Sequence, residues 1–209
     1  MKRDEVILVR GGGDLATGTI HRLWSAGLKE AEQPAAIRRQ VSVSEAVYEG
    51  EAVVEGMRAT LVQTLDEAVV IWCRGDVPVM VDPKGALIPQ VRPAVVVDAI
   101  LAKRNLGTTR DMAPLTIALG PGFTAGEDVD FVVETKRGHR LGRIIREGIA
   151  IPNTGVPGVI GGYSAERVVR AAREGIFHEL RAIGDVVEPG DVIAEIEAFD
   201  GTRTPVTTC

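Results

Sequence analysis

Three glycine-rich segments have compositions that could support ligand binding. The first follows the apolar run Val6–Val9 and reads Arg-Gly-Gly-Gly-Asp-Leu-Ala-Thr-Gly over residues 10–18. Its spacing matches G-x-G-x-x-G/A, in which small residues let backbone N–H groups approach a phosphate at the start of a helix. A tight strand-to-helix turn that binds nothing would have the same sequence. The phosphate-binding hypothesis gives six candidate residues here: Gly11, Gly12, Gly13, Asp14, Ala16 and Gly18.

Two features argue against an ordinary dinucleotide site at this turn. Asp14, the expected helix cap, would place a carboxylate beside a pyrophosphate, and a bridging cation such as Mg²⁺ or a pterin-type ligand would relieve the repulsion. A ribose-binding acid is expected about 20 residues further on. Glu30 and Glu32 have this spacing, but Lys29–Ala31 is too short and too polar to be a second strand. We therefore do not expect an ordinary NAD site.

Two further groups complete the candidate ligand site. Arg38 and Arg39 are adjacent, and paired guanidinium groups suit a phosphate or carboxylate, although a solvated helix end would look the same. Gly120 and Gly122 follow the apolar run Leu115–Leu119, at a strand end where open α/β sheets bind ligands. A third glycine-rich segment spans residues 153–162. Tight turns alone explain these loops equally well. Basic residues gather nearby at Lys136, Arg137, His139, Arg140 and Arg143.

The sequence contains no recognisable catalytic nucleophile or metal-binding motif. The three histidines are scattered, and neither C-x-x-C nor H-x-x-x-H occurs. Cys73 follows Trp72 in an apolar run, which is typical of a buried, inert thiol. The sequence therefore assigns no catalytic residue and no metal ligand, and it leaves open whether the protein is an enzyme.

The elements that must position these residues predict an α/β fold. Residues 1–163 are interpreted as a Rossmann-like N-terminal domain with additional β-structure, because apolar β-branched runs alternate with glycine turns and helical patterns. Helices are expected over residues 14–27 and 93–103, where Pro93 suits a first turn and Asn105-Leu-Gly107 a stop. Strands are expected over residues 6–9, 52–55, 58–62, 69–73, 79–82, 115–119, 129–134 and 141–146.

Residues 164–209 form a second, smaller predicted domain. Gly184-Asp185 and Gly190-Asp191 punctuate short alternating strands, whereas Ala165–Glu174 fits a helix equally well. Residues 183–197 resemble one half of a biotinyl/lipoyl-type barrel-sandwich module. The carrier lysine of such modules is replaced here by Ala198-Phe-Asp-Gly, and the matching half-repeat is missing, so a partial, truncated module with a structural or interaction role is expected.

Composition limits the classes of partner. The 209 residues carry a net charge of −5, which argues against a broad surface for nucleic acid or anionic membranes. Two cysteines exclude a disulfide framework, and no stretch approaches the roughly 18 apolar residues of a membrane span. The apolar run near the start is too short for a signal peptide. We expect a soluble cytoplasmic protein.

Together these motifs make the chain resemble the YqeB-type family of accessory proteins of the selenium-dependent molybdenum hydroxylase system. The resemblance implies a role in maturation of a molybdenum hydroxylase, with hydroxylase subunits as partners, and it supplies no catalytic set. The chain departs from the family pattern in a shortened second strand after Leu28 and in the absent half-module after Asp200. The resemblance covers residues 10–18, 33–50, 97–126, 133–139 and 152–163.

Three hypotheses about function follow. The first is an accessory protein that binds a phosphorylated ligand, either a nucleotide or a molybdenum-cofactor species, with Mg²⁺ as a candidate companion. The second is a small NAD(P)-dependent oxidoreductase, which would need a ribose-binding acid on a proper second strand. The third is an interaction module whose loops bind no small molecule.

Overall fold

The computed structural model describes residues 6–33, 42–164, 168–182 and 184–208. Contacts within the chain divide it into two units, Met1–Asn153 and Thr154–Cys209. This division falls somewhat before the boundary that the sequence suggests at residue 163.

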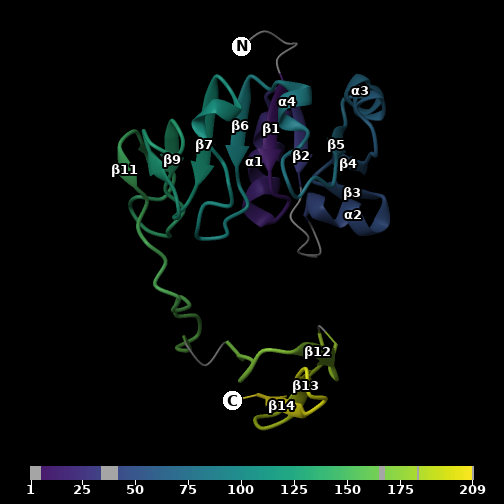
Figure 1. The fold of residues 1–209 in the computed structure, drawn as a ribbon, viewed down its shortest axis with the longest axis vertical. Helices are drawn as coiled ribbons and strands as arrows, with labels where there is room; N and C mark the ends of the chain where they lie inside the picture. The colour runs from purple at the N-terminus through teal and green to yellow at the C-terminus, as the bar shows by residue number, and fades with distance from the viewer. Residues whose placement is uncertain (1–5, 34–41, 165–167, 183, 209) are drawn as a thin grey trace. The chain divides into compact units, whose positions relative to one another are not determined.

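β1 (Val6–Arg10) lies at the centre of the nine-stranded sheet in the first unit (Figure 1). Ile7 and Val9 belong to the cluster that includes Ala16 and Ile20 of α1 (Asp14–Ser25), whereas Leu8 packs with Ile88 of α4 (Ile88–Val91). Both faces of β1 are therefore covered. This explains its continuous apolar run, since a buried parallel strand needs no alternation of polar and apolar residues.

The strand order of this sheet is β10-β9-β7-β6-β1-β2-β5-β4-β3. β1 pairs in parallel with β2 and β6, and the parallel pairing continues through β5 to β4 on one side and through β7 to β9 on the other. Two hairpins, β3–β4 and β9–β10, are antiparallel. The other strands of the sheet are β2 (Lys29–Gln33), β3 (Glu51–Val54), β4 (Met57–Leu61), β5 (Val77–Val79), β6 (Val95–Asp98), β7 (Leu115–Leu119), β9 (Phe131–Val133) and β10 (Ile144–Ile145).

Short elements complete the first unit. β8 (Thr124–Ala125) and β11 (Gly148–Ile149) form a separate antiparallel pair. None of the helices in the described part of the chain is long and apolar enough to cross a membrane. The remaining helical segments are η1 (Val43–Glu45), α2 (Ala46–Glu49), α3 (Leu65–Cys73) and η2 (Arg110–Met112).

The predicted α/β class is confirmed, but two predicted elements are wrong. Residues 69–73 are not a strand, because they lie in α3, whose start is capped by Thr64: its hydroxyl accepts a hydrogen bond from the Glu67 N–H at 3.2 Å. Residues 93–103 are not a helix, because the buried β-branched run Val95–Val97 forms β6 between β1 and β7. Pro93 therefore precedes a strand, and its compatibility with a first helical turn was misleading.

The predicted absence of a full second strand is also wrong. Lys29–Gln33 forms β2 and pairs residue by residue with β1, from Val6 opposite Lys29 to Arg10 opposite Gln33. The polar composition of this segment did not exclude a strand, because the neighbouring strands β1 and β5 supply backbone hydrogen-bond partners on both sides.

The second unit contains a three-stranded antiparallel sheet in the order β12-β13-β14. Ala194, Ile196 and Val206 form its small buried cluster. Residues 168–174 are not helical, which corrects the helix alternative for that stretch, and residues 165–167 lie outside the described part. The lipoyl-like interpretation of this unit stays a prediction. Its strands are β12 (Ile176–Glu179), β13 (Val192–Glu197) and β14 (Arg203–Thr207).

Gly11 allows the segments after β1 and β6 to pack together. Its φ is +110°, and a Cβ added there would lie 2.7 Å from the carbonyl oxygen of Ala99. The Ala99 N–H also donates to the Arg10 carbonyl at 2.8 Å. Only glycine fits this combination of backbone angle and close approach.

We expect Gly11→Ala to lower the free energy of unfolding of the protein by about 2–3 kcal/mol, because the methyl group adds both strain and overlap. The matched control is Gly18→Ala in the exposed part of α1, where an added Cβ meets no atom within 4 Å. This control should be about 0.5–1 kcal/mol more stable than wild type. Urea denaturation measures both, and equal stabilities for the two variants would contradict the packing role of Gly11.

Candidate functional site

The candidate site lies at the carboxyl ends of the parallel strands of the first unit. The chain adds β2 on one side of β1 and later β6 on the other, so the strand order reverses between β1 and β6. Loops diverge at such a reversal, and open α/β sheets bind ligands there. The predicted turn at residues 11–13 follows β1 at this point (Figure 1).

The start of α1 is open on the side of Gly13. Gly13 is the N-cap residue in an extended conformation (φ −76°, ψ −171°), and no side chain caps the helix. The expectation that Asp14 caps the helix is therefore wrong, because Asp14 is the first helical residue. Its carboxylate still lies near the positive end of the helix dipole, which stabilises the negative charge. The first hydrogen bond of the helix runs from the Thr17 N–H to the Gly13 carbonyl. The N–H groups of Leu15 and Ala16 therefore have no acceptor within the helix. A Cβ added to Gly13 would meet no atom within 4 Å.

The other side of the turn is covered by η1. The Ser44 N–H donates to the Gly12 carbonyl at 3.1 Å, and the Val43 N–H donates to Thr17 Oγ1 at 3.1 Å. Thr17 Oγ1 in turn donates to the Gly13 carbonyl at 2.9 Å. These contacts hold the carbonyl groups of the turn within the protein, so the turn can offer N–H groups to an anion.

A buried ionic network joins the ends of β1 and β6. Arg10 Nη1 lies 3.5 Å from Asp98 Oδ2 and also donates to Thr108 Oγ1, which donates to Asp98 Oδ2 at 2.5 Å. All three residues are buried. The second carboxylate oxygen of Asp98 accepts from the Ile100 N–H at 3.1 Å. Arg10 therefore neutralises an internal carboxylate. Sequence reasoning placed Arg10 at this turn but missed Asp98 and Thr108, which are distant in the chain.

Gly120 and Gly122 approach protein atoms closely. A Cβ on Gly120 would lie 2.6 Å from Thr135 Oγ1 and 3.0 Å from Leu101 Cδ2, and one on Gly122 would lie 2.6 Å from Arg104 Cα. The φ values of the two glycines are +78° and +112°. Loop packing therefore accounts for both glycines, and ligand contact at these positions stays a prediction.

The remaining predicted candidates divide as follows. Ala16 is buried against the core and Gly18 is exposed in α1. Arg38 and Arg39 lie outside the described residues. Most of the third glycine-rich segment belongs to the second unit, and a Cβ added at any of its glycines would meet no atom within 4 Å.

Cys73 is exposed, which corrects the expectation of a buried thiol. It is the last residue of the amphipathic helix α3, whose buried residues are Ala68 and Ile71. In the described part of the chain, no three His, Cys, Asp or Glu side chains gather in a group that could hold a metal ion.

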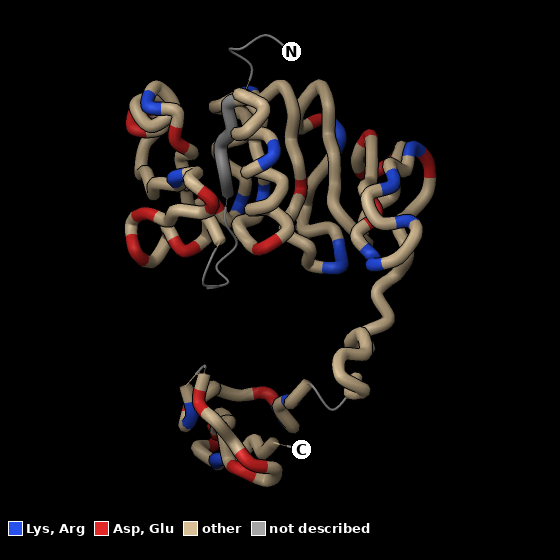
Figure 2. The backbone as a smooth tube through the Cα atoms, turned by 180° about the vertical axis from the view of Figure 1, so that it is seen from behind, with Lys and Arg blue, Asp and Glu red and all other residues tan. Residues whose placement is uncertain are grey.

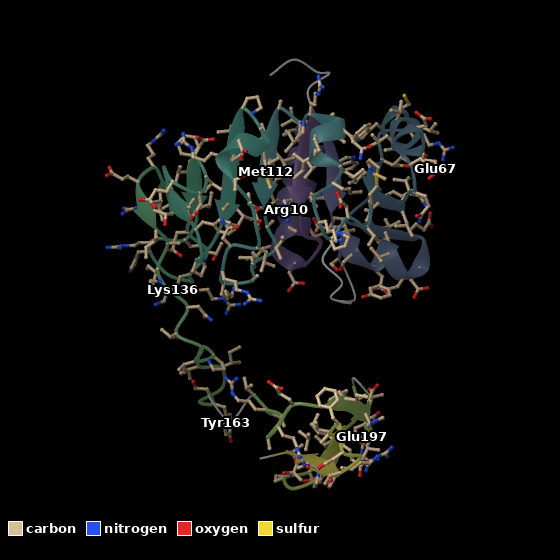
Figure 3. All side chains as sticks on the ribbon, viewed as in Figure 1. Arg10, Glu67, Met112, Lys136, Tyr163 and Glu197 are labelled. Carbon is tan, nitrogen blue, oxygen red and sulfur yellow. The ribbon has the colours of Figure 1, made fainter. Side chains whose placement is uncertain are left out.

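Glu134 is a buried carboxylate at the carboxyl end of β9. Its Oε1 accepts from the Lys136 N–H and its Oε2 from the Ile151 N–H, both at 2.8 Å. Burial alone raises the pKa of Glu134, but the hydrogen bonds from the backbone of Ile151, Lys136 and Thr135, together with the charge of Lys136, bring the pKa below its ordinary value. The ionised carboxylate therefore fixes the start of the loop between β9 and β10. In Figure 3, Lys136 lies at the edge of the first unit and Arg10 lies further inside it.

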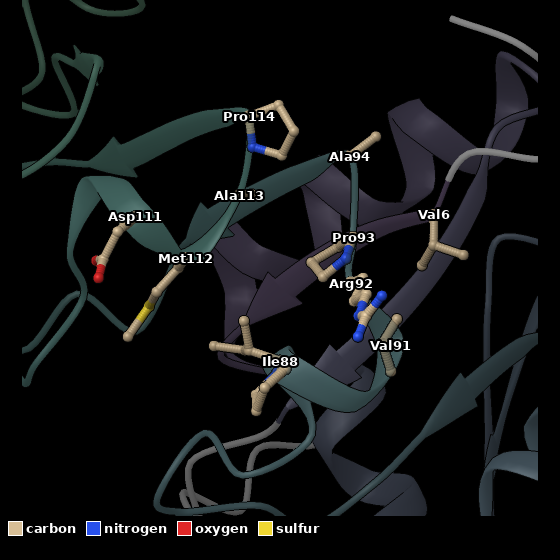
Figure 4. Close-up of a pocket in the computed structure, with 11 residues that line it drawn as sticks. Val6, Ile88, Val91, Arg92, Pro93, Ala94, Asp111, Met112, Ala113 and Pro114 are labelled. Carbon is tan, nitrogen blue, oxygen red and sulfur yellow. The ribbon is translucent and has the colours of Figure 1, made fainter.

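A groove of about 880 Å³ lies at the opposite, amino edge of the sheet (Figure 4). Val6, Ala94 and Pro114, which begin or precede β1, β6 and β7, contribute to its wall. Its lining is mostly apolar and includes three prolines, with Arg92 and Asp111 as its charged residues. No residue of the glycine turn lines it, so the candidate phosphate site and this groove are separate features.

Comparison with known proteins finds one strong similarity. The chain is 51% identical over 207 residues to the uncharacterized protein YqeB of Escherichia coli (strain K12), a match that covers 97% of this chain and 38% of that protein. The relative carries the family name that the sequence motifs suggest. No family model matches the chain, and no solved structure matches it.

Asp98→Asn should lower the free energy of unfolding by about 3–5 kcal/mol, because it removes the carboxylate charge that lies beside the buried Arg10 guanidinium. The matched control is Glu51→Gln, which breaks an exposed ion pair with Arg58 of 2.7 Å. Glu51→Gln should lower the free energy of unfolding by less than about 1 kcal/mol, although the Glu51–Arg58 pair is shorter than the Arg10–Asp98 pair. Urea denaturation at pH 7 measures both. If the two substitutions lower the free energy of unfolding equally, burial does not determine how much the Arg10–Asp98 pair contributes to stability.

Glu134→Gln should lower the free energy of unfolding by about 1–3 kcal/mol at pH 7, since an amide nitrogen would face backbone donors. Because folding lowers the pKa of Glu134, its contribution is present above the unfolded pKa of about 4.3 and disappears as pH falls through the folded value. Stability measured from pH 7 to pH 3 should show the two proteins converging in acid. A constant difference across this range would argue against an ionised Glu134.

Proposed function

We propose that the first unit binds a phosphate-bearing small molecule at the glycine turn after β1. The observation that carries this proposal is the uncapped start of α1 beside Gly13, with open space where a side chain would otherwise project. Backbone N–H groups at a helix start favour an anion through hydrogen bonds and the helix dipole. The Gly12 carbonyl accepts from the Ser44 N–H of η1 and the Gly13 carbonyl accepts from Thr17, so both carbonyl groups have partners within the protein.

A Rossmann-like interpretation of the first unit is part of the proposal. Its support is the reversal of strand order between β1 and β6, with the G-x-G-x-x-A turn directly after β1. A nucleotide or a molybdenum-cofactor species fits such a turn, since both carry a phosphate group. Asp14, exposed at the first helical position, would then sit near the anion, which is why Mg²⁺ is included as a companion.

We further propose that the protein is a cytoplasmic accessory factor in maturation of a selenium-dependent molybdenum hydroxylase. This part rests on the family resemblance of the motifs and on the similarity to YqeB. Hydroxylase subunits are its proposed partners.

One observation favours a second candidate, an NAD(P)-dependent oxidoreductase. β2 exists and pairs with β1, so an acidic residue can stand on the strand that carries the ribose-binding acid in dinucleotide sites. Glu32 lies opposite Val9 of β1 and Val79 of β5 in the register of the sheet.

Gly13→Ala tests the phosphate site. The backbone at Gly13 is extended and the space is open, so the variant should unfold at the wild-type temperature within about 2 °C. Its methyl group would occupy the place of the ligand oxygens. In isothermal titration with ADP, with and without Mg²⁺, we expect at least about tenfold weaker binding, the loss of roughly 1.4 kcal/mol of charge-assisted hydrogen bonding.

Gly18→Ala is the control and should bind ADP as wild type does. Wild-type affinity in Gly13→Ala would overturn the proposed site, as would failure of wild type to bind ADP, inorganic phosphate and the molybdenum cofactor. A ligand stabilises the state that it binds. The oxidoreductase hypothesis would be supported if NADH raised the unfolding temperature of the wild-type protein but did not raise that of Glu32→Gln.

A further inference from the structure

The loops after β6 and β9 carry exposed cations. Residues 99–110, 119–126 and 135–146 contain no Asp or Glu, although the chain as a whole has a net charge of −5. Within the described chain, six exposed cations of these loops make no side-chain hydrogen bond or ion pair. Figure 2 shows basic residues in the loops along this edge. The six are Lys103, Arg104, Lys136, Arg137, Arg140 and Arg143.

The three loops touch one another. Gly120, after β7, packs between Leu101 of the loop after β6 and Thr135 of the loop after β9. Gly122 packs against the backbone of Lys103 and Arg104. The loop after β7 therefore contributes little side-chain bulk of its own and lies between two loops that contribute cations. The cations of segments more than 30 residues apart in sequence belong to one surface.

The backbone that carries these cations is held in place. Leu101 and Lys103 both have positive φ, +59° and +64°, a conformation that costs a non-glycine residue energy and persists where surroundings enforce it. The side chain of Asn105 accepts from the N–H groups of Gly107 and Thr108, both at 2.8 Å. On the other side, Glu134 fixes the backbone of Lys136. Such fixed positions reduce the entropy that a ligand must overcome.

Strand spacing sets the distance between this surface and the glycine turn. Neighbouring strands lie about 4.8 Å apart, so the ends of β1 and β9, separated by β6 and β7, are about 14 Å apart. The loop that carries Lys136 therefore begins three strand spacings away from the glycine turn. A small molecule with a chain of phosphates, or with two phosphates at separated positions, spans this distance. Single-stranded nucleic acid is disfavoured, because these loops contain no exposed aromatic side chain for base stacking.

We propose that Lys103, Arg104 and Lys136 form a second anion subsite, which binds a further phosphate group of an extended ligand whose first phosphate lies at Gly13. This inference rests on the proposed function and specifies the ligand as a molecule with several phosphate groups. Lysine and arginine in one cluster suit phosphate oxygens, since arginine binds them in a bidentate manner and lysine as a point charge.

Titration calorimetry of the full chain with inorganic tripolyphosphate and with inorganic phosphate tests the subsite. Arg104→Gln and Lys136→Gln should each weaken tripolyphosphate binding by about fivefold to tenfold, because each removes a charge-assisted contact, and should change phosphate binding less than twofold. Arg74→Gln is the matched control: Arg74 caps α3 at the amino edge of the sheet, is exposed and has no ion pair in the described chain. It should bind both probes as wild type does.

The outcomes separate this inference from the proposed function. Loss of tripolyphosphate binding in Arg104→Gln and Lys136→Gln, with no effect of Gly13→Ala on either probe, would support the basic subsite and overturn the glycine-turn site. Loss in Gly13→Ala alone would support the glycine-turn site and overturn the second subsite. Equal weakening by Arg74→Gln would show that the anion responds to net charge, and it would also overturn the subsite.

Discussion

The buried pair of Arg10 and Asp98 fixes the geometry on which the rest of the candidate site depends. It joins the ends of β1 and β6, where the strand order reverses, and Thr108 ties the loop after β6 to the same pair. A buried charge without a partner is costly, so each member of this network holds the others in place. The glycine turn, the start of α1 and the loop that carries Lys103 and Arg104 all extend from these anchored strand ends.

The glycines at this edge serve two different physical purposes. Gly11, Gly120 and Gly122 have positive φ and allow loops to approach within distances that a Cβ would prevent. Gly13 has an ordinary extended backbone and open space beside it, so its lack of a side chain has no packing explanation. Glycine therefore supports the packing of the edge at three positions, and at Gly13 it leaves open space where the proposed ligand site lies.

Charge is distributed against the overall composition of the chain. A protein with a net charge of −5 places exposed cations in the loops after β6 and β9, while the buried carboxylates Asp98 and Glu134 are satisfied by hydrogen bonds or ion pairs. The net negative charge of the chain disfavours association of a broad surface with polyanions, whereas the local group of cations favours a small anion. The arrangement combines a backbone held by hydrogen bonds with exposed cations that form no ion pair in the described chain, and the proposed second subsite rests on this combination.

The sequence by itself determined the α/β class, the strand β1, the helix α1 and the glycine turn between them, because these depend on local patterns: an apolar run, a helical periodicity and small residues at a turn. Only the tertiary structure decided the rest. The valine run of β6 and the polar segment of β2 became strands because β1 and its neighbours supply their hydrogen-bond partners. Likewise, Asp98 and Thr108 lie 88 and 98 residues from Arg10 in the sequence and meet it through strand pairing, a long-range contact that no local spacing encodes.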